Sequence, residues 1–197
     1  MEIEGLKISK NMRMIYKGYE VDPIFYSLKK VSWQVLLSLH FKGSEYISDS
    51  VNGEKNRQKA VSVMIGGARR QLGLARNDLI HVANSEKQND RCHIHALVIS
   101  KEKALVDSQI LNRALKANAP REILSFPSVS SVDEAFKALD GCLDAVAYYC
   151  KRNKNDMEVR SEYISPLARS FLKLHADTPL RFESNELKIW DSAPLSL

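Results

Sequence analysis

The sequence predicts an α+β fold with a central antiparallel β-sheet and flanking helices. Three observations predict this fold class. Residues 33–41 alternate apolar and polar side chains, as a strand does, and residues 54–72 repeat apolar side chains at helical spacing. Further along, two strand-like runs are separated by the polar, turn-rich segment 84–90, which predicts a hairpin. Strands interleaved with helices that have one apolar face indicate a sheet covered by helices.

The first elements follow from side-chain periodicity. Trp33 to Phe41 is predicted as a strand, and Glu54 to Leu72 as a helix that carries apolar residues on one face. Gly66-Gly67 inside this helix indicates either a weak point or a close contact with another element. Leu79 to Ala83 and the run Cys92 to Ile99 are predicted as the two strands of the hairpin.

The later elements are marked by capping residues and prolines. Asp107 can cap a helix over residues 107–117. Residues 123–129 are predicted as a strand, which Pro127 restricts to the edge of a sheet. A capping box then opens a long helix over residues 131–151.

Composition and charge narrow the class of protein. Hydrophobic residues make up 44% and charged residues 27% of the chain, values that are ordinary for a globular protein of 197 residues. The net charge is +5 and the pI is about 9.0. The excess is concentrated in one window, which suggests a polyanionic partner. Between Glu54 and Arg76 this window contains the basic residues Lys55, Arg57, Lys59, Arg69, Arg70 and Arg76.

The sequence also indicates where the protein works. The chain has an odd number of cysteines, three, and they do not form the pattern of a disulfide framework. They are Cys92, Cys142 and Cys150. The N-terminal residues lack the basic and apolar pattern of a signal segment, and no apolar run approaches the length that spans a membrane. We therefore expect a cytoplasmic protein that has no membrane partner.

The motif His93-Ile94-His95 carries the most chemical information. Residues i and i+2 of a strand point to the same face, so both imidazoles are expected on one side of the sheet. Two converging imidazoles are half of a metal site. Three residues are candidates for a third ligand: Glu86, at the turn end of the hairpin; His81, if the hairpin is centred near Gln88; and Asp90. Two imidazoles and one carboxylate would leave positions on the ion open for a substrate.

A possible nucleophile lies at the end of the long predicted helix. Tyr148 has Lys151 three residues later, and Tyr149 has Arg152 at the same spacing, so each tyrosine shares a helical face with a cation. A cation stabilises the phenolate form of tyrosine, which is the activation that covalent catalysis needs. The lysine spacing favours Tyr148, whereas the position of Tyr149 beside the predicted buried stripe favours Tyr149.

Together these motifs carry a resemblance. An alternating apolar strand, then His93-Ile94-His95, then Tyr148-x-x-Lys151 is similar to the three-motif order of the HUH endonucleases, and most similar to their rolling-circle replication initiators, the Rep class. Glu86 resembles the carboxylate that completes the metal site in viral members. The resemblance implies an HUH endonuclease domain over residues 1–155, with residues 156–197 as a C-terminal extension packed on the same domain.

The resemblance also implies an activity. A divalent ion, Mg or Mn, would polarise the scissile phosphate of single-stranded DNA at a replication origin, and tyrosine would attack it to leave a 5′-phosphotyrosine. On this hypothesis Glu86, His93 and His95 bind the metal, Tyr148 or Tyr149 is catalytic with help from Lys151, and six cations bind DNA: Lys55, Arg57, Lys59, Arg69, Arg70 and Arg152. No phosphate-loop motif occurs, so a host helicase and polymerase would be the partners. The alternatives are a single-strand transposase of the same superfamily and a catalytically inactive DNA-binding protein.

Overall fold

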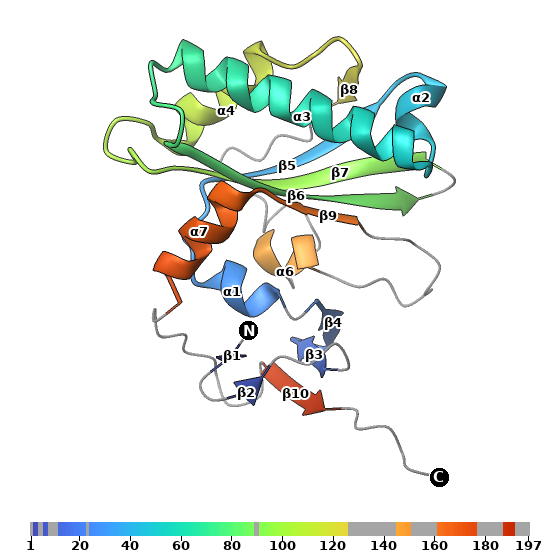
Figure 1. The fold of residues 1–197 in the computed structure, drawn as a ribbon, viewed down its shortest axis with the longest axis vertical. Coiled ribbons are helices and arrows are strands. Elements are labelled where there is room, and N and C mark those ends of the chain that lie inside the picture. The colour runs from blue at the N-terminus through green and yellow to red at the C-terminus, as the bar shows by residue number, and fades with distance from the viewer. Residues whose placement is uncertain are drawn as a thin grey trace.

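The computed structural model describes residues 2–3, 6–7, 12–22, 24–88, 91–125, 145–150, 161–176 and 187–191. Its core is an antiparallel sheet with helices on both faces (Figure 1), so the predicted α+β class is confirmed. None of the helices within the described residues is long and apolar enough to cross a membrane.

The central sheet has the strand order β8-β5-β7-β6-β9. These strands are β5 (Val35–Phe41), β6 (Leu79–Gln88), β7 (Arg91–Ser100), β8 (Ile123–Ser125) and β9 (Ser161–Ile164). All neighbours pair antiparallel. β8 joins the edge through a register shift in β5 between His40 and Phe41, which agrees with the edge position that Pro127 predicts. β7 is therefore the middle strand.

The β6–β7 hairpin is longer than the sequence predicts. β6 continues through Gln88, which pairs with Arg91, so the segment 84–88 is strand and not turn. Asn84, Ser85 and Glu86 are buried against β7. The prediction of a turn from 84 to 90 was wrong because pairing and burial in the sheet override the weak turn preference of polar residues.

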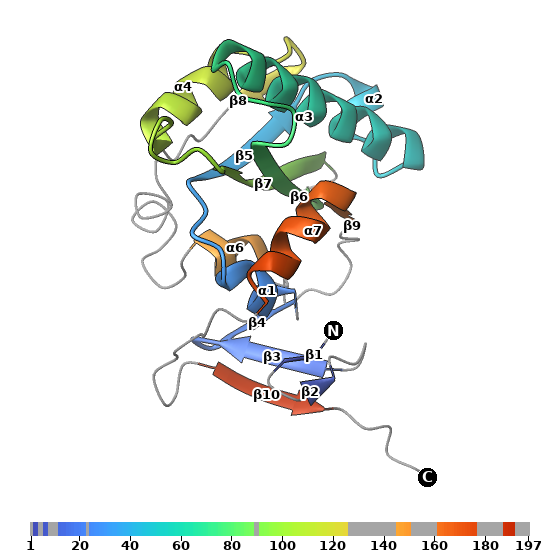
Figure 2. The same ribbon diagram turned by 60° about the vertical axis from the view of Figure 1, so that its left-hand side comes forward.

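Helices α3 (Val51–Gln71) and α4 (Ser108–Ala117) cover one face of the sheet, as Figures 1 and 2 show. Ser50 caps α3 by accepting a hydrogen bond from Gly53 N at 3.1 Å. Gly67 lies against the end of α4, where a Cβ atom would lie 2.5 Å from Asn118 Oδ1. The glycine pair thus marks a close helix contact. Apolar residues of α3 and α4 form a core with Leu37, Ile94 and their neighbours.

Three shorter helices cover the opposite face: α1 (Phe25–Lys29), α6 (Ala145–Cys150) and α7 (Pro166–Leu174). Their core includes Val146 and Tyr149 of α6 together with Leu36, Leu97 and Val82 of the sheet. The rest of the predicted helix, residues 131–144 and 151, lies outside the described residues, as does the predicted domain boundary after 155. The short helix α2 (Ser44–Ile47) follows β5.

The chain ends form a separate small sheet of order β10-β3-β4. Its strands are β3 (Met12–Tyr16), β4 (Tyr19–Val21) and β10 (Leu187–Asp191), and a two-stranded pair, β1 (Glu2–Ile3) with β2 (Leu6–Lys7), lies nearby. Figure 2 shows α1 between this sheet and the central one. Residues after 160 therefore contribute to both sheets, through β9 and β10.

Candidate metal centre

Three side chains of the β6–β7 hairpin meet on one face of the sheet. His93 and His95 are two residues apart on β7 and so point the same way. Glu86 lies directly opposite His93 in the register of β6 and β7, and Asn84 lies opposite His95. Glu86, His93 and His95, named here the metal triad, thus come from two paired strands in the middle of the sheet.

The distances within the metal triad fit a single ion. His95 Nε2 lies 3.1 Å from His93 Nε2 and 3.1 Å from Glu86 Oε2, and the His93–Glu86 distance is 3.6 Å. An ion about 2.1 Å from its ligands keeps neighbouring ligand atoms about 3.0 Å apart in octahedral and about 3.4 Å apart in tetrahedral geometry. The triad can therefore hold a metal ion on three protein ligands.

The metal triad is buried, so the charge of Glu86 must be compensated inside the protein. The exposed fractions are 2% for His95, 6% for His93 and 9% for Glu86. A buried carboxylate is costly unless a cation or hydrogen-bond donors compensate its charge. Here its nearest partners are two imidazole Nε2 atoms, which must carry protons or share a metal ion to provide that compensation. Neutral imidazole and carboxylate together are a common ligand set for divalent ions.

His40 extends the site on the third strand. Its ring stacks on His93, with ring centroids 5.1 Å apart and an interplanar angle of 8°. Unlike the metal triad, His40 is exposed. Partial burial, and secondly the charge of His95, lower the pKa of His40. The sequence analysis missed this residue, although continuing the β5–β7 register one step beyond Leu39 and Ile94 brings His40 beside His93.

Asn84 connects the metal triad to helix α6. Its side chain is 3% exposed, and its Nδ2 donates a hydrogen bond to the carbonyl oxygen of Tyr149 at 2.8 Å. The end of α6 is also held by Asp22 N, which donates to Cys150 O at 2.8 Å. A helix that carries the two candidate tyrosines is thereby fixed on the face of the sheet that contains the triad. Sequence patterns did not reveal the role of Asn84, because the segment that contains it is predicted as a turn.

The structure describes the side chain of Tyr149 but not that of Tyr148. Tyr149 is 1% exposed and packs in the core with Val82 and Leu97. The side chain of Tyr148 lies outside the described residues, as do Lys151 and Arg152, so their predicted roles stay predictions.

His81 does not belong to the metal triad, although the sequence analysis offered it as a third ligand. It pairs with Val98 instead of His95, because Gln88 pairs with Arg91 and the hairpin is therefore not centred at Gln88. His81 is an odd number of residues from Glu86, so it points to the opposite face, toward α3. Asp90, the other alternative, lies outside the described residues.

The basic window lies on the opposite side of the sheet from the triad. Lys55, Lys59 and Arg70 are exposed on α3, which covers the far face. Arg69 is partly buried, and its Nη1 donates to Leu74 O at 3.0 Å. The structure therefore does not bring these cations together with the metal triad, and their contact with DNA stays a prediction.

The prediction that Arg57 binds DNA was wrong, because its side chain is buried. Its side chain is 2% exposed; Nε donates to Ser85 Oγ at 3.0 Å, and Nη1 donates to the carbonyl oxygens of Tyr46 and Ser48. The guanidinium thus ties α2 and α3 to the sheet from inside the protein. A phosphate backbone on the surface cannot reach it.

Comparisons of the chain with protein-family models, with curated proteins and with solved structures find no match. The functional interpretation of the metal triad therefore depends on its own geometry and on the motif order of the chain.

Proposed function

We propose that this protein is a divalent-metal-dependent HUH endonuclease that nicks and rejoins single-stranded DNA through a tyrosine, as a rolling-circle replication initiator does. One observation carries the proposal. The metal triad lies on the middle strand and its neighbour, and the helix with both tyrosines is hydrogen-bonded to the same face through Asn84. A structural histidine pair would not require this combination of ligands and helix.

The chemistry follows from these groups. The tyrosine oxygen attacks the phosphorus of a phosphodiester, the bond from phosphorus to the 3′ oxygen breaks, and the 3′ oxygen takes up a proton. The products are a 5′-phosphotyrosine and a 3′-hydroxyl, which can attack in turn and rejoin the strand. Mg or Mn held by Glu86, His93 and His95 would supply Lewis-acid polarisation of the phosphate.

We assign the nucleophile to Tyr148. The burial of Tyr149 in the apolar core supports this choice, because a nucleophile must reach a phosphate that arrives from solvent. Lys151, three residues after Tyr148, would favour the phenolate and so lower the pKa of Tyr148. This role of Lys151 is part of the proposal and follows from sequence spacing alone.

The exposed cations of α3 would contact DNA away from the metal triad. Lys55, Lys59 and Arg70 are exposed on α3, and we infer that they bind backbone phosphates of a strand on the far face of the sheet. Each phosphate contact removed from single-stranded DNA should lower the slope of log affinity against log salt by about 0.7. An unchanged slope in the variant lacking all three charges would mean that α3 does not contact DNA.

The test is formation of a covalent adduct. The protein is incubated with a library of randomised single-stranded oligonucleotides and Mn²⁺, and adducts that resist denaturant are mapped by peptide mass spectrometry. We expect an adduct on Tyr148, none with Tyr148→Phe or His95→Ala, and a retained adduct with Tyr149→Phe. The two Phe variants are matched, because each removes one hydroxyl from adjacent residues.

The other outcomes identify the alternatives. An adduct on Tyr149 would move the nucleophile by one residue and give the supporting role to Arg152. Adducts that form only with paired hairpin ends would indicate a single-strand transposase. DNA binding without an adduct, in either Mg²⁺ or Mn²⁺, would contradict the proposal and indicate an inactive DNA-binding protein.

A further inference from the structure

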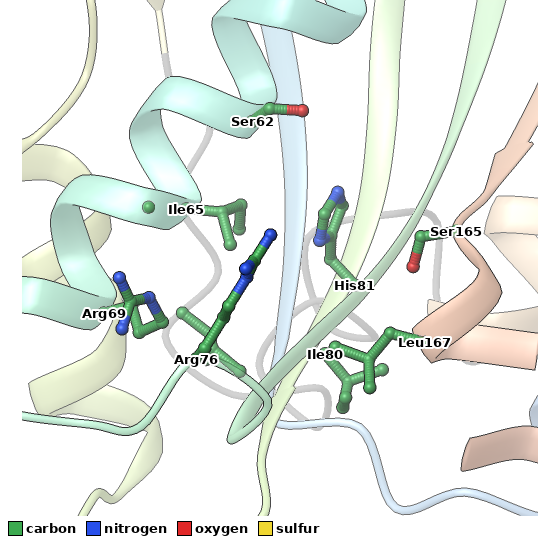
Figure 3. Close-up of a pocket in the computed structure, with 10 residues that line it drawn as sticks. Ser62, Ile65, Arg69, Arg76, Ile80, His81, Ser165 and Leu167 are labelled. Atoms are coloured by element: carbon green, nitrogen blue, oxygen red, sulfur yellow. The ribbon is translucent and has the colours of Figure 1, made fainter. Parts of the chain in front are cut away.

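A cavity of about 180 Å³ lies where the outer edge of β6 is uncovered. β9 pairs with residues 82–85 of β6, and no strand among the described residues covers residues 79–81 on that side. The gap is bounded by α3, by the loop after α3 and by the start of α7 (Figure 3). His81 lines this cavity and lies on the opposite face of β6 from Glu86, so the cavity is separate from the metal triad.

The polar residues that line the cavity are suited to an anion. They are Ser62, Arg69, Arg76, His81 and Ser165, and the ten lining residues include no carboxylate. Neither Arg69 nor Arg76 forms an ion pair with a carboxylate among the described residues. Figure 3 shows the guanidinium of Arg76 extending from the loop toward the ring of His81. Among the described residues, the lining thus supplies positive charge and no carboxylate to the cavity.

The neutral donors of the lining complement the arginines. Ser165 Oγ accepts a hydrogen bond from Ala168 N at 3.1 Å, so its hydroxyl proton is available to a further acceptor. Ser62 differs, because its hydroxyl donates to Gln58 O at 2.9 Å. Burial lowers the pKa of His81 to about 4, so at neutral pH its ring is uncharged and has one N–H donor. A guanidinium with such donors matches the oxygens of a phosphate.

The volume restricts the size of the ligand. The volume of the cavity, about 180 Å³, is small for a ligand site. Pockets for drug-sized ligands are larger, about 300 to 1,000 Å³. The cavity therefore has room for a single tetrahedral oxyanion, and the rest of any larger ligand would stay outside it.

We propose that this cavity is a phosphate-binding site, formed by Arg69, Arg76, His81 and Ser165, that is independent of the metal triad. The phosphate group is either free in solution or part of a nucleic-acid backbone. Both sources present the same oxygens to the site. The proposal does not rest on the nuclease activity, and it stands if the tyrosine chemistry fails.

The test is a titration of the whole chain with inorganic phosphate, followed by NMR of the histidine side chains. Ionic strength is held constant with chloride, and a chelator removes metal ions. We expect saturable shifts of the His81 signals and a rise in the pKa of His81, because a bound phosphate favours the imidazolium form. The signals of His93 and His95 should not move.

Two arginine variants separate the site from general surface charge. Arg76→Gln should weaken phosphate binding about tenfold or more, because it removes charge-assisted hydrogen bonds. Arg113→Gln is the matched control: it removes the same charge from an exposed residue of α4 that does not line the cavity, and it should leave phosphate affinity unchanged. Melting temperatures verify that both variants are folded.

The outcomes either support or overturn the proposal. No saturable shift of His81, or equal weakening by Arg113→Gln and Arg76→Gln, overturns it. Phosphate binding that a short single-stranded oligothymidine displaces supports it and identifies the backbone as the source. Phosphate binding that the oligothymidine does not displace supports it and identifies a free phosphate group. Failure of adduct formation at Tyr148 would not change any of these results.

Discussion

The two faces of the central sheet bury polar side chains in opposite ways. Ser85 and Glu86 are neighbours on β6 and point to opposite faces. On the α3 face, Ser85 accepts a hydrogen bond from the buried Arg57, whose other donated bonds reach two backbone carbonyls. On the α6 face, Glu86 meets the Nε2 atoms of His93 and His95, and three ligand atoms converge on one point.

The difference separates a structural polar cluster from a binding site. Around Arg57, Nε and Nη1 donate to three acceptors of the protein itself, and these bonds stabilise the fold. In the metal triad, nitrogen and carboxylate oxygen atoms face one another and need protons or a shared metal ion between them. Burial is similar in both, since Arg57 is 2% and His95 is 2% exposed. The two clusters are therefore distinguished by the atoms that converge in them, and not by their burial. Donors meet acceptors around Arg57, whereas possible metal-ligand atoms meet one another in the metal triad.

The largest effect is expected at Arg57. Arg57→Ala leaves Ser85 and two carbonyls without their donor and removes a large buried side chain, which should lower the free energy of unfolding by about 3 kcal/mol or more. Chemical denaturation measures this loss. The control is Lys59→Ala, which changes an exposed residue of the same helix and should alter stability by less than about 0.5 kcal/mol. Equal, small effects of both variants would remove the structural role of Arg57.

Metal binding to the triad is expected to change the free energy of unfolding by a smaller amount than Arg57→Ala does. Mn²⁺ at a hundred times its dissociation constant should raise the free energy of unfolding by about 2.7 kcal/mol, and His95→Ala should abolish this increment. His81→Gln is the control, because His81 lies on the opposite face and should leave the increment intact. If His81→Gln removed the increment and His95→Ala kept it, the assignment of the two faces would be wrong.

Parts of both polar clusters could be predicted from the sequence. The spacing of His93 and His95 places them on one face of a strand, and Glu86 lies near them in the hairpin. The register of the hairpin could not be predicted, because a polar turn does not specify its centre. A shift of one or two residues in that centre decides whether His81 or Asn84 faces His95.

Arg57 shows a signal that was present but misinterpreted. It is three residues before Ala60 and four before Val61, so it lies on the apolar stripe of α3 and not on its solvent face. Helical spacing alone therefore indicated burial. Charge composition suggested a DNA contact instead, because it counts cations without regard to their face. Burial of Arg57 is favourable because its guanidinium donates to acceptors of Ser85, Tyr46 and Ser48. These three residues lie outside α3, so the helical pattern cannot reveal them.

The free energy of unfolding of the protein should depend on pH through His81, which lies on the α3 face of the sheet. Burial lowers the pKa of His81 from 6.5 to about 4, so between these values the unfolded chain binds a proton that the folded protein does not. Stability is therefore lost as pH falls below about 6.5, by about 2 kcal/mol between pH 7.5 and pH 5. The measurement compares denaturation of the unaltered protein and His81→Gln at both pH values. A loss of the same size in the variant would mean that His81 does not contribute.

The smallest effect is expected at Asn84, which connects the triad face to α6. Asn84→Ala removes the hydrogen bond to Tyr149 O and should cost about 1 kcal/mol of stability. Because α6 carries the proposed nucleophile, the rate of adduct formation should fall while Mn²⁺ affinity stays within about twofold. A full adduct rate in Asn84→Ala would show that this bond does not position the tyrosine helix.

The central claim is that Glu86, His93 and His95 bind one divalent ion. Its most direct test is a crystal grown with Mn²⁺, in which anomalous scattering locates the metal. The account predicts one manganese peak about 2.2 Å from His93 Nε2, from His95 Nε2 and from a carboxylate oxygen of Glu86. It also predicts that the peak is absent from crystals of His93→Ala. Crystals of the unaltered protein that show no manganese peak at this position would contradict the assignment of the metal site. The same peak in crystals of His93→Ala would also contradict it.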